Sequence, residues 1–300
     1  MVEIFTQKEI ERISMDLLKQ SKSIDIFPTP VDNIVRFAEL VHDNGLDLSK
    51  PDPSFLSRMS ASACAALMDS LNKVRGFLDR PGKTIYVDLN QIQPRQSFVK
   101  LHETGHQVLT WQSDIIEHLD DDDTLSADTK EEFEAEANFF ASVTLFQHDR
   151  FDGEMEKLEL SLKAGMALAK KFGSSNHAAL RRMVEKSNKK CALLVLHTHS
   201  GIILHGMDCK KKSLFQSQSF TQEFGNLNIP EVLGYNWIFT QDYISGKKFH
   251  EGGEVILETS GGMENFKYHY FNNNYNAFFF IIPFGEVQKS RTKIVLRNYT

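Results

Sequence analysis

The sequence predicts an α+β protein in which helices dominate the first part of the chain and strands the last. Apolar residues recur at helical spacing up to about residue 190. Beyond Cys191, short runs of β-branched and aromatic residues alternate with turns rich in glycine, asparagine and lysine. A chain of 300 residues with 41% hydrophobic content is long enough for two domains of ordinary size. We therefore expect a mostly helical domain over residues 1–150, a helical segment over 151–190 and a β-rich domain over 191–300.

The first elements follow from the spacing of apolar residues. A helix is expected near the N-terminus, because four apolar residues share one face: Ile10, Ile13, Leu17 and Leu18. After the two prolines of FPTP, a second helical period runs from Val31 to Val41. A third helix is expected near Phe55 to Val74. The β-branched and aromatic run Thr84–Val87 then predicts a short strand.

Helices are expected to follow this strand. Pro94 suits a first helical turn, so a helix should start there and continue through SFVKLHETGHQVL, residues 97–109. Further helices are expected from about Thr129 to Phe146 and from Met155 to Phe172. The segment KKFGSSNHAALRRMVEKS, residues 170–187, has the outline of a helix-turn-helix, because a glycine turn separates two helical stretches.

Composition limits the classes of partner and compartment. The formal net charge of -6 at pH 7 gives no general attraction to nucleic acid or to an anionic membrane. The three cysteines, Cys64, Cys191 and Cys209, form no CxxC pair, which argues against a disulfide framework. The N-terminus lacks the apolar core of a signal peptide, and no apolar run approaches membrane-spanning length. We therefore expect a cytoplasmic protein without a membrane partner.

The stretch HETGH carries the most specific chemistry. His102 and His106 are four residues apart, so a helix presents both imidazoles on one face to a single ion. Zn²⁺ is the metal that this arrangement suits, and the adjacent Glu103 is then the general base that takes a proton from the attacking water. The alternative is a chance match in which both histidines are ordinary core residues. Gly105 and the flanking apolar residues favour the metal site.

A catalytic zinc ion usually has three protein ligands, so a third is required. The candidates are His118, Glu134 and Glu136. Glu134 is preferred because it shares a helix face with Asn138, whose amide could hydrogen-bond a ligating histidine. Glu136 is the alternative ligand; it points about 200° away from Glu134 on an ideal helix, so only one of them can face the metal. The group that stabilises the oxyanion cannot be identified from sequence.

The sequence resembles the ImmA/IrrE family of bacterial metallopeptidases. The resemblance rests on SFVKLHETGHQVL followed by a second motif that reads E-x-x-A-N-x-F-A from Glu134 to Ala141, and it covers roughly residues 5–190. It implies a zincin-like domain that uses Zn²⁺ to cut a protein, commonly a helix-turn-helix repressor. Such cleavage would switch on a stress-response, defence or mobile-element operon. Some relatives carry a GAF-like sensor domain, so the β-rich region could bind a signal ligand.

Two other functions stay open at this point. A non-catalytic regulator could bind a repressor or DNA through the same fold, and a protease toxin could act on many proteins. Basic residues near the helix-turn-helix-like segment allow contact with DNA, although a solvated basic face is the preferred interpretation. Three histidines in the β-rich region, His197, His199 and His205, are better explained as a hairpin surface than as a second metal site.

Overall fold

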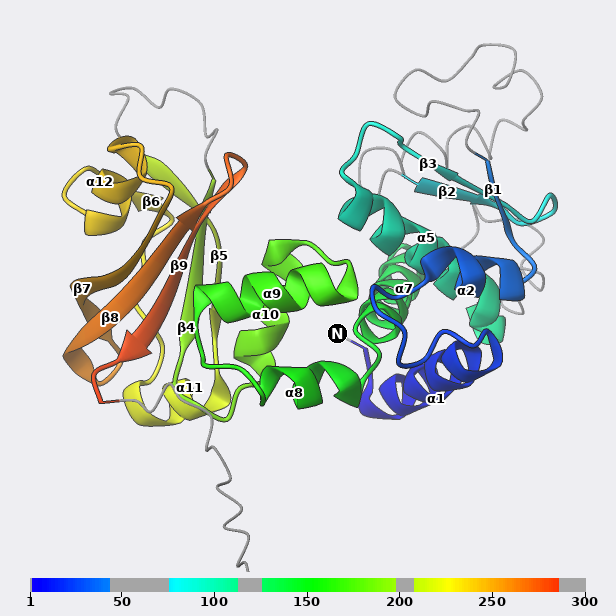
Figure 1. The fold of residues 1–300 in the computed structure, drawn as a ribbon, viewed down its shortest axis with the longest axis horizontal. Helices are drawn as coiled ribbons and strands as arrows, with labels where there is room; N and C mark the ends of the chain where they lie inside the picture. The colour runs from blue at the N-terminus through cyan, green and yellow to red at the C-terminus, as the bar shows by residue number, and fades with distance from the viewer. Residues whose placement is uncertain (1, 44–75, 113–125, 198–207, 286–300) are drawn as a thin grey trace, which may run out of the picture. The chain divides into compact units, whose positions relative to one another are not determined.

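The computed structural model describes residues 2–43, 76–112, 126–197 and 208–285, which Figure 1 draws in colour. Its contacts divide the chain into two compact units. Unit 1 contains residues 1–151 and 170–175, and unit 2 contains 152–169 and 176–300. Each unit has a hydrophobic core of its own. The architecture is therefore α+β, and the division into three parts at residues 150 and 190 stays a prediction.

Unit 1 combines a helical core with a small sheet. Its elements are α1 (Ile4–Gln20), α2 (Val31–Phe37), β1 (Val41–Asp43), β2 (Gly76–Asp79), β3 (Thr84–Val87), α5 (Gln93–Val108) and α7 (Ala127–Leu145). The strand order is β1-β3-β2, with β1 parallel and β2 antiparallel to β3. The predicted strand Thr84–Val87 is confirmed as β3. The helix expected near Phe55 to Val74 lies outside the described residues.

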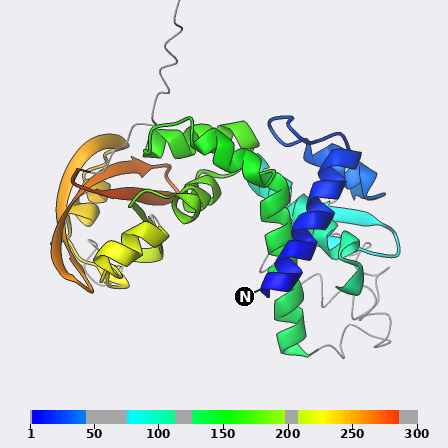
Figure 2. The same ribbon diagram turned by 90° about the horizontal axis from the view of Figure 1, so that it is seen from below.

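The core of unit 1 forms where α1, α5 and α7 pack together. Fully buried apolar side chains come from all three helices: Ile10, Leu18, Val99, Leu101 and Phe140. Figure 2 shows α1, in dark blue, alongside the green α7. A buried hydrogen bond of 2.7 Å between the hydroxyls of Ser14 and Thr144 joins the same two helices. The helix that carries HETGH is thus fixed in the centre of this unit.

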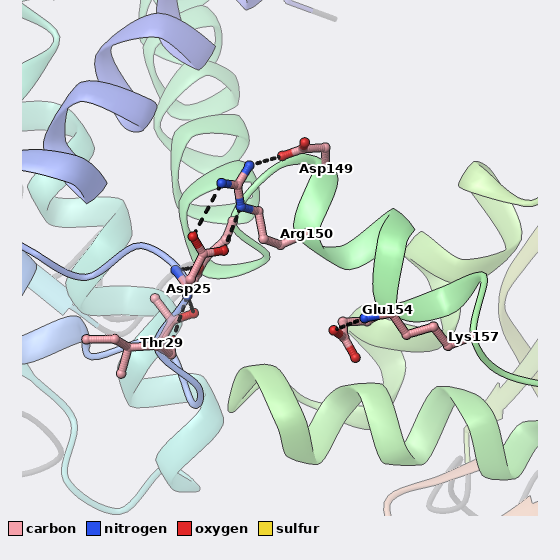
Figure 3. A network of polar contacts seen from close by, with 8 residues as sticks. Asp25, Thr29, Asp149, Arg150, Glu154 and Lys157 are labelled. Atoms are coloured by element: carbon pink, nitrogen blue, oxygen red, sulfur yellow. Dashed lines mark hydrogen bonds and ion pairs between the residues drawn. The ribbon is translucent and has the colours of Figure 1, made fainter.

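Polar contacts fasten the segment between α1 and α2 to the end of α7. The buried amide of Gln147 accepts from the backbone N–H of Asp25 at 2.7 Å and donates to the hydroxyl of Thr29 at 3.0 Å. Figure 3 shows the guanidinium of Arg150 between two carboxylates, with Nε 2.9 Å from Asp25 and Nη1 2.7 Å from Asp149. Gln147 lies just beyond α7, and Arg150 lies in the first turn of the following helix, α8 (Asp149–Met155). These contacts hold this part of the chain against the loop between α1 and α2, which stabilises the position of α7.

Two expected helices are wrong in their extent. The helix expected from Val31 to Val41 ends at Phe37, because Glu39 has a positive φ of 58° and Val41 begins strand β1. The helix expected from Met155 to Phe172 is interrupted. The chain turns after Met155, and α9 begins at Leu162 where the Ser161 hydroxyl accepts from the backbone N–H of Ala164 at 3.1 Å. In both cases a local break overrides a continuous apolar period.

Unit 2 is built on one curled sheet of six strands (Figure 1). Its strands, in chain order, are β4 (Ala192–His197), β5 (Cys209–Gln216), β6 (Val232–Leu233), β7 (Phe249–Thr259), β8 (Gly262–Asn272) and β9 (Asn276–Pro283). The spatial order is β6-β5-β4-β9-β8-β7, with antiparallel neighbours throughout. The β-rich character predicted beyond Cys191 is confirmed.

Helices cover both faces of this sheet. The helices are α10 (Asn176–Lys186), α11 (Gln218–Phe224) and α12 (Ile238–Ile244); α8 (Asp149–Met155) and α9 (Leu162–Phe172) have residues in both units. Phe239 of α12 packs on Phe279 of β9, whereas His177 of α10 packs on the neighbouring Phe278. Successive strand residues point to opposite faces, so β4 and β9 are buried on both sides. Among the described helices, none combines the length and apolar character that a membrane span requires.

Candidate metal centre

The HETGH stretch lies on α5, which begins at a proline turn and is buried in its second half. Pro94 occupies the first turn of α5, where a missing N–H costs no helical hydrogen bond. Every residue from Val99 to Gly105 is buried, and the side chain of His102 is only 1% exposed. The hydroxyl of Thr104 donates to the backbone carbonyl of Lys100 at 2.7 Å, which satisfies a polar group that would otherwise be buried without a partner.

Gly105 allows α5 and α7 to approach closely. A Cβ atom at this position would lie 3.1 Å from Cδ1 of Phe140 and 3.3 Å from Cα of Ala137, both on α7. Carbon atoms in good contact are about 3.5–4.0 Å apart, so any side chain here would push the two helices away from each other. The glycine between the two histidines therefore permits the spacing that brings α7 to the motif.

Glu134 on α7 meets the two histidines of α5. Its Oε2 lies 3.4 Å from Nε2 of His102, and its Oε1 lies 3.5 Å from Nε2 of His106. The two histidine Nε2 atoms are 3.1 Å apart. All the ligand atoms of this group lie within 4.8 Å of one another, and the structure shows no second such group among the residues that it describes.

These distances suit a zinc ion. Four ligands at about 2.0–2.1 Å in a tetrahedron are separated by about 3.3 Å, which is close to the three separations observed here. Two imidazoles and one carboxylate are also the donor set of a catalytic site that leaves one position open. Burial raises the pKa of Glu134, but the two neighbouring imidazoles of His102 and His106 outweigh this effect and hold the pKa well below its ordinary value. The carboxylate is therefore charged at neutral pH, as a metal ligand must be.

Glu103 is buried beside the two histidines and is 5% exposed. Burial raises its pKa above the ordinary value, although the neighbouring His102 and His106 act in the opposite direction. The carboxylate also lies against the start of β2, because a Cβ on Gly76 would be 3.1 Å from its Oε1 and would overlap Val99. The glycine of β2 thus leaves room for the side chain that the sequence identifies as the general base.

Glu136, the alternative ligand, faces a different set of partners. Its Oε2 accepts from Nε2 of Gln112 at 2.7 Å and from Nε1 of Trp111 at 2.9 Å. Gln112 in turn contacts Nδ1 of His106 through its Oε1 at 2.8 Å. The two glutamates therefore lie on opposite sides of His106, in keeping with their expected angular separation. The helical spacing in the sequence predicted that only one of the two glutamates faces the metal, but no sequence pattern identified Gln112 or Trp111 as partners of Glu136.

The other predicted site residues are placed less centrally. Asn138 is exposed, and its Nδ2 donates to the backbone carbonyl of Glu134 at 2.8 Å, so it contacts the turn of α7 that carries the carboxylate. Its expected bond to a ligating histidine stays a prediction. His118, which was the third candidate ligand, lies outside the described residues, as do His199 and His205 of the β-rich region.

A histidine pair on one helix, a carboxylate on the next and a buried glutamate define a metallopeptidase-type centre. Residues 65–184 match the family model described as the IrrE N-terminal-like domain, Peptidase M78, which spans both motif helices. These residues therefore match the ImmA/IrrE family, as the motifs predicted. No curated protein matches it. A solved structure of a Mycobacterium tuberculosis transcriptional regulator is similar over 92% of this chain and 76% of that chain, with 13% identity and a TM-score of 0.48.

Proposed function

We propose that the protein is a zinc-dependent endopeptidase with a zincin-like catalytic domain. His102, His106 and Glu134 hold the metal, and Glu103 acts as the general base. The observation that carries this proposal is the triangle of ligand atoms between α5 and α7, with a buried carboxylate one residue from the first ligand. The match of residues 65–184 to a peptidase family supports the same class of reaction.

The residues divide the chemistry between them. Zinc in this position supplies Lewis acidity, which polarises a carbonyl and lowers the pKa of water to about 7. Glu103 accepts a proton from the attacking water at its carboxylate and passes it to the nitrogen of the leaving amine. Burial raises the pKa of Glu103 above its ordinary value, and a carboxylate of higher pKa accepts a proton from water more readily. The surrounding buried residues of α5 exclude bulk water from the carboxylate.

Metal content tests the ligand set. Elemental mass spectrometry of the purified protein should find about one zinc ion per chain. His102→Ala and Glu134→Ala should lose it, whereas Glu132→Ala, at an exposed position of the same helix α7, should retain it. Zinc that survives Glu134→Ala would move the third ligand to Glu136 or His118, and absence of zinc from the wild type would overturn the metal centre.

Glu103→Gln separates binding from catalysis. The amide has the same shape as the carboxylate but cannot accept the proton, so this variant should keep zinc and lose peptide cleavage. Cleavage can be followed by labelling new protein N-termini in cells that express either form. Equal cleavage by the two forms would overturn the role of Glu103.

We propose that the substrate is a helix-turn-helix transcriptional repressor, whose loss switches on a stress-response, defence or mobile-element operon. The match of residues 65–184 to the ImmA/IrrE family supports this substrate class. The labelling experiment should then find new N-termini in one repressor or a few. New N-termini in many unrelated proteins would favour a protease toxin. A cellular effect that Glu103→Gln retains would favour the non-catalytic regulator.

We propose that the β-rich region of unit 2 is a GAF-like sensor that receives a signal ligand. Its separate hydrophobic core, with helices on both faces of one sheet, supports a domain that has a function distinct from that of unit 1. Thermal denaturation in the presence of a panel of small metabolites tests this role, because a ligand that binds the folded state raises the melting temperature. A panel without effect would count against a sensor for those ligand classes.

A further inference from the structure

A buried chain of hydrogen bonds leads away from the metal centre behind His106. Its members are Trp111 and Gln112, which follow the end of α5, and Glu136 on α7. The side chain of Gln112 is completely buried and that of Glu136 is 4% exposed. In this setting each hydrogen bond constrains the next, because an unsatisfied buried polar group costs about 1–3 kcal/mol.

The position of Gln112 follows from the way in which α5 ends. Leu109 leaves the helical conformation with a ψ of 82°, and the backbone N–H of Gln112 then bonds to the carbonyl of Leu109 at 3.0 Å. The chain therefore turns at Leu109. This turn places the amide of Gln112 between His106 of α5 and Glu136 of α7.

The partners of Gln112 decide which way round its amide lies. Its nitrogen is 2.7 Å from a carboxylate oxygen of Glu136 and 3.3 Å from the backbone carbonyl of Phe133. A backbone carbonyl can only accept, so the nitrogen of the amide must face these two oxygens. The amide oxygen then faces Nδ1 of His106 at 2.8 Å, and it also can only accept. Nδ1 of His106 must therefore carry the proton.

This orientation determines the free nitrogen of His106. A neutral imidazole has one N–H and one lone pair, so protonation at Nδ1 leaves the lone pair on Nε2. Nε2 is the atom that lies 3.1 Å from Nε2 of His102 and 3.5 Å from Oε1 of Glu134. A hydrogen-bonded partner on the other ring nitrogen is the usual way in which a protein orients a metal-ligating histidine.

Within the described part of the chain, His102 has no equivalent support. Its Nδ1 is buried and has no hydrogen-bond partner among the described residues. The carboxylate of Glu136 is itself held in place, because the oxygen that accepts from Gln112 also accepts from Trp111. The structural support thus converges on His106.

We propose that Gln112 and Glu136 are positioning residues that hold His106 in the tautomer with a free Nε2, and that Trp111 fixes the carboxylate of Glu136. The proposal rests on the proposed metal centre for its purpose. Its content can be tested without metal, because the tautomer is a property of the protein's own hydrogen bonds. Glu136 is accordingly assigned to supporting a ligand rather than to binding the metal.

The first test is the tautomer of His106 in the metal-free protein. Nitrogen-15 NMR of labelled histidine distinguishes a protonated from an unprotonated ring nitrogen. At a pH high enough for the imidazole of His106 to be neutral, the wild type should show an unprotonated Nε2, and Gln112→Leu, which removes the acceptor, should give a mixture of tautomers. Thr104→Val removes a buried hydrogen bond of the same helix that does not involve His106, so this control should leave the wild-type signal unchanged.

The second test compares two substitutions of Glu136. Glu136→Leu removes the oxygen that accepts from Gln112 and Trp111, so the amide of Gln112 loses its orienting partner and the tautomer should be disturbed. Glu136→Gln keeps an amide oxygen that can accept from both donors, so it should retain the wild-type tautomer. A wild-type tautomer in Glu136→Leu would overturn the role of Glu136. The two indole N–H signals of the protein allow the bond from Trp111 to be followed in each variant.

Zinc affinity provides the third readout, measured by competition with a coloured chelator. Loss of an outer partner of a metal-ligating histidine typically weakens metal binding about 10–100-fold, and we expect this loss for Gln112→Leu. An unchanged His106 tautomer in Gln112→Leu would overturn the proposal, and so would wild-type zinc affinity in that variant. If the wild type binds no zinc, the proposed function fails, while the tautomer in metal-free protein still decides the positioning role.

Discussion

Replacing Gly105 by alanine places a methyl group where α5 and α7 come closest. The new Cβ would lie 3.1 Å from a ring carbon of Phe140 and 3.3 Å from the backbone Cα of Ala137. The ring of Phe140 is fully buried in the core, and a backbone atom cannot rotate away. The two helices must therefore separate by a few tenths of an ångström, which moves His102 and His106 relative to Glu134.

Two opposing effects set the magnitude. Alanine stabilises a helix interior by about 1 kcal/mol relative to glycine. Overpacking a well-filled core costs about 1–3 kcal/mol. The expected net loss for Gly105→Ala is therefore about 0–2 kcal/mol in the free energy of unfolding. Gly105→Val adds two more carbons and loses the helix gain, so it should be clearly more destabilising.

Urea denaturation measures this difference in unit 1. The protein has two tryptophans, Trp111 in unit 1 and Trp237 in unit 2. On a Trp237→Phe background, the emission of Trp111 therefore reports the unfolding of unit 1. Zinc affinity should also fall in Gly105→Ala, because two of the ligands lie on α5 and the third lies on α7. A variant that is more stable by about 1 kcal/mol, with unchanged zinc affinity, would refute the close-approach reasoning.

Three further predictions concern other parts of the chain. Gly165→Ala should destabilise unit 2, since its Cβ would lie 2.2 Å from Cδ2 of Leu180. Gly153→Ala has open space around its Cβ and should stabilise its helix by about 1 kcal/mol. The urea midpoint should therefore fall in the first variant and rise in the second. Burial and the nearby Lys212 and Arg181 lower the pKa of His177 to about 4. The unfolded chain then binds the extra proton between the ordinary pKa of about 6.5 and that value, so stability should fall as pH falls through this window, and His177→Phe should flatten the slope. Removal of zinc by a chelator should lower the melting temperature of unit 1, and restoring zinc should reverse the change; an unaltered melting temperature would contradict a metal that binds the folded state.

The sequence was most informative where a short pattern reflects local physics. Helical spacing placed His102 and His106 on one face, and the same rule separated Glu134 from Glu136 by about 200°. Both patterns agree with the positions of these side chains in the structure. Sequence reasoning failed at helix ends. A residue with positive φ near the end of α2 and a serine cap before α9 interrupted apolar periods that looked continuous.

The sequence by itself determined the α+β class, the strand ahead of the metal motif, and the residue types that can bind zinc and move a proton. These features depend on local spacing, which a single segment contains. Only the tertiary structure decided that Gln112 lies between His106 and Glu136, and that Gly105 lets the two motif helices touch. Such contacts join residues of different helices, and their geometry depends on how the chain turns after α5 and how closely α7 packs. No local pattern records that geometry, because it arises when the separate helices bury their faces together.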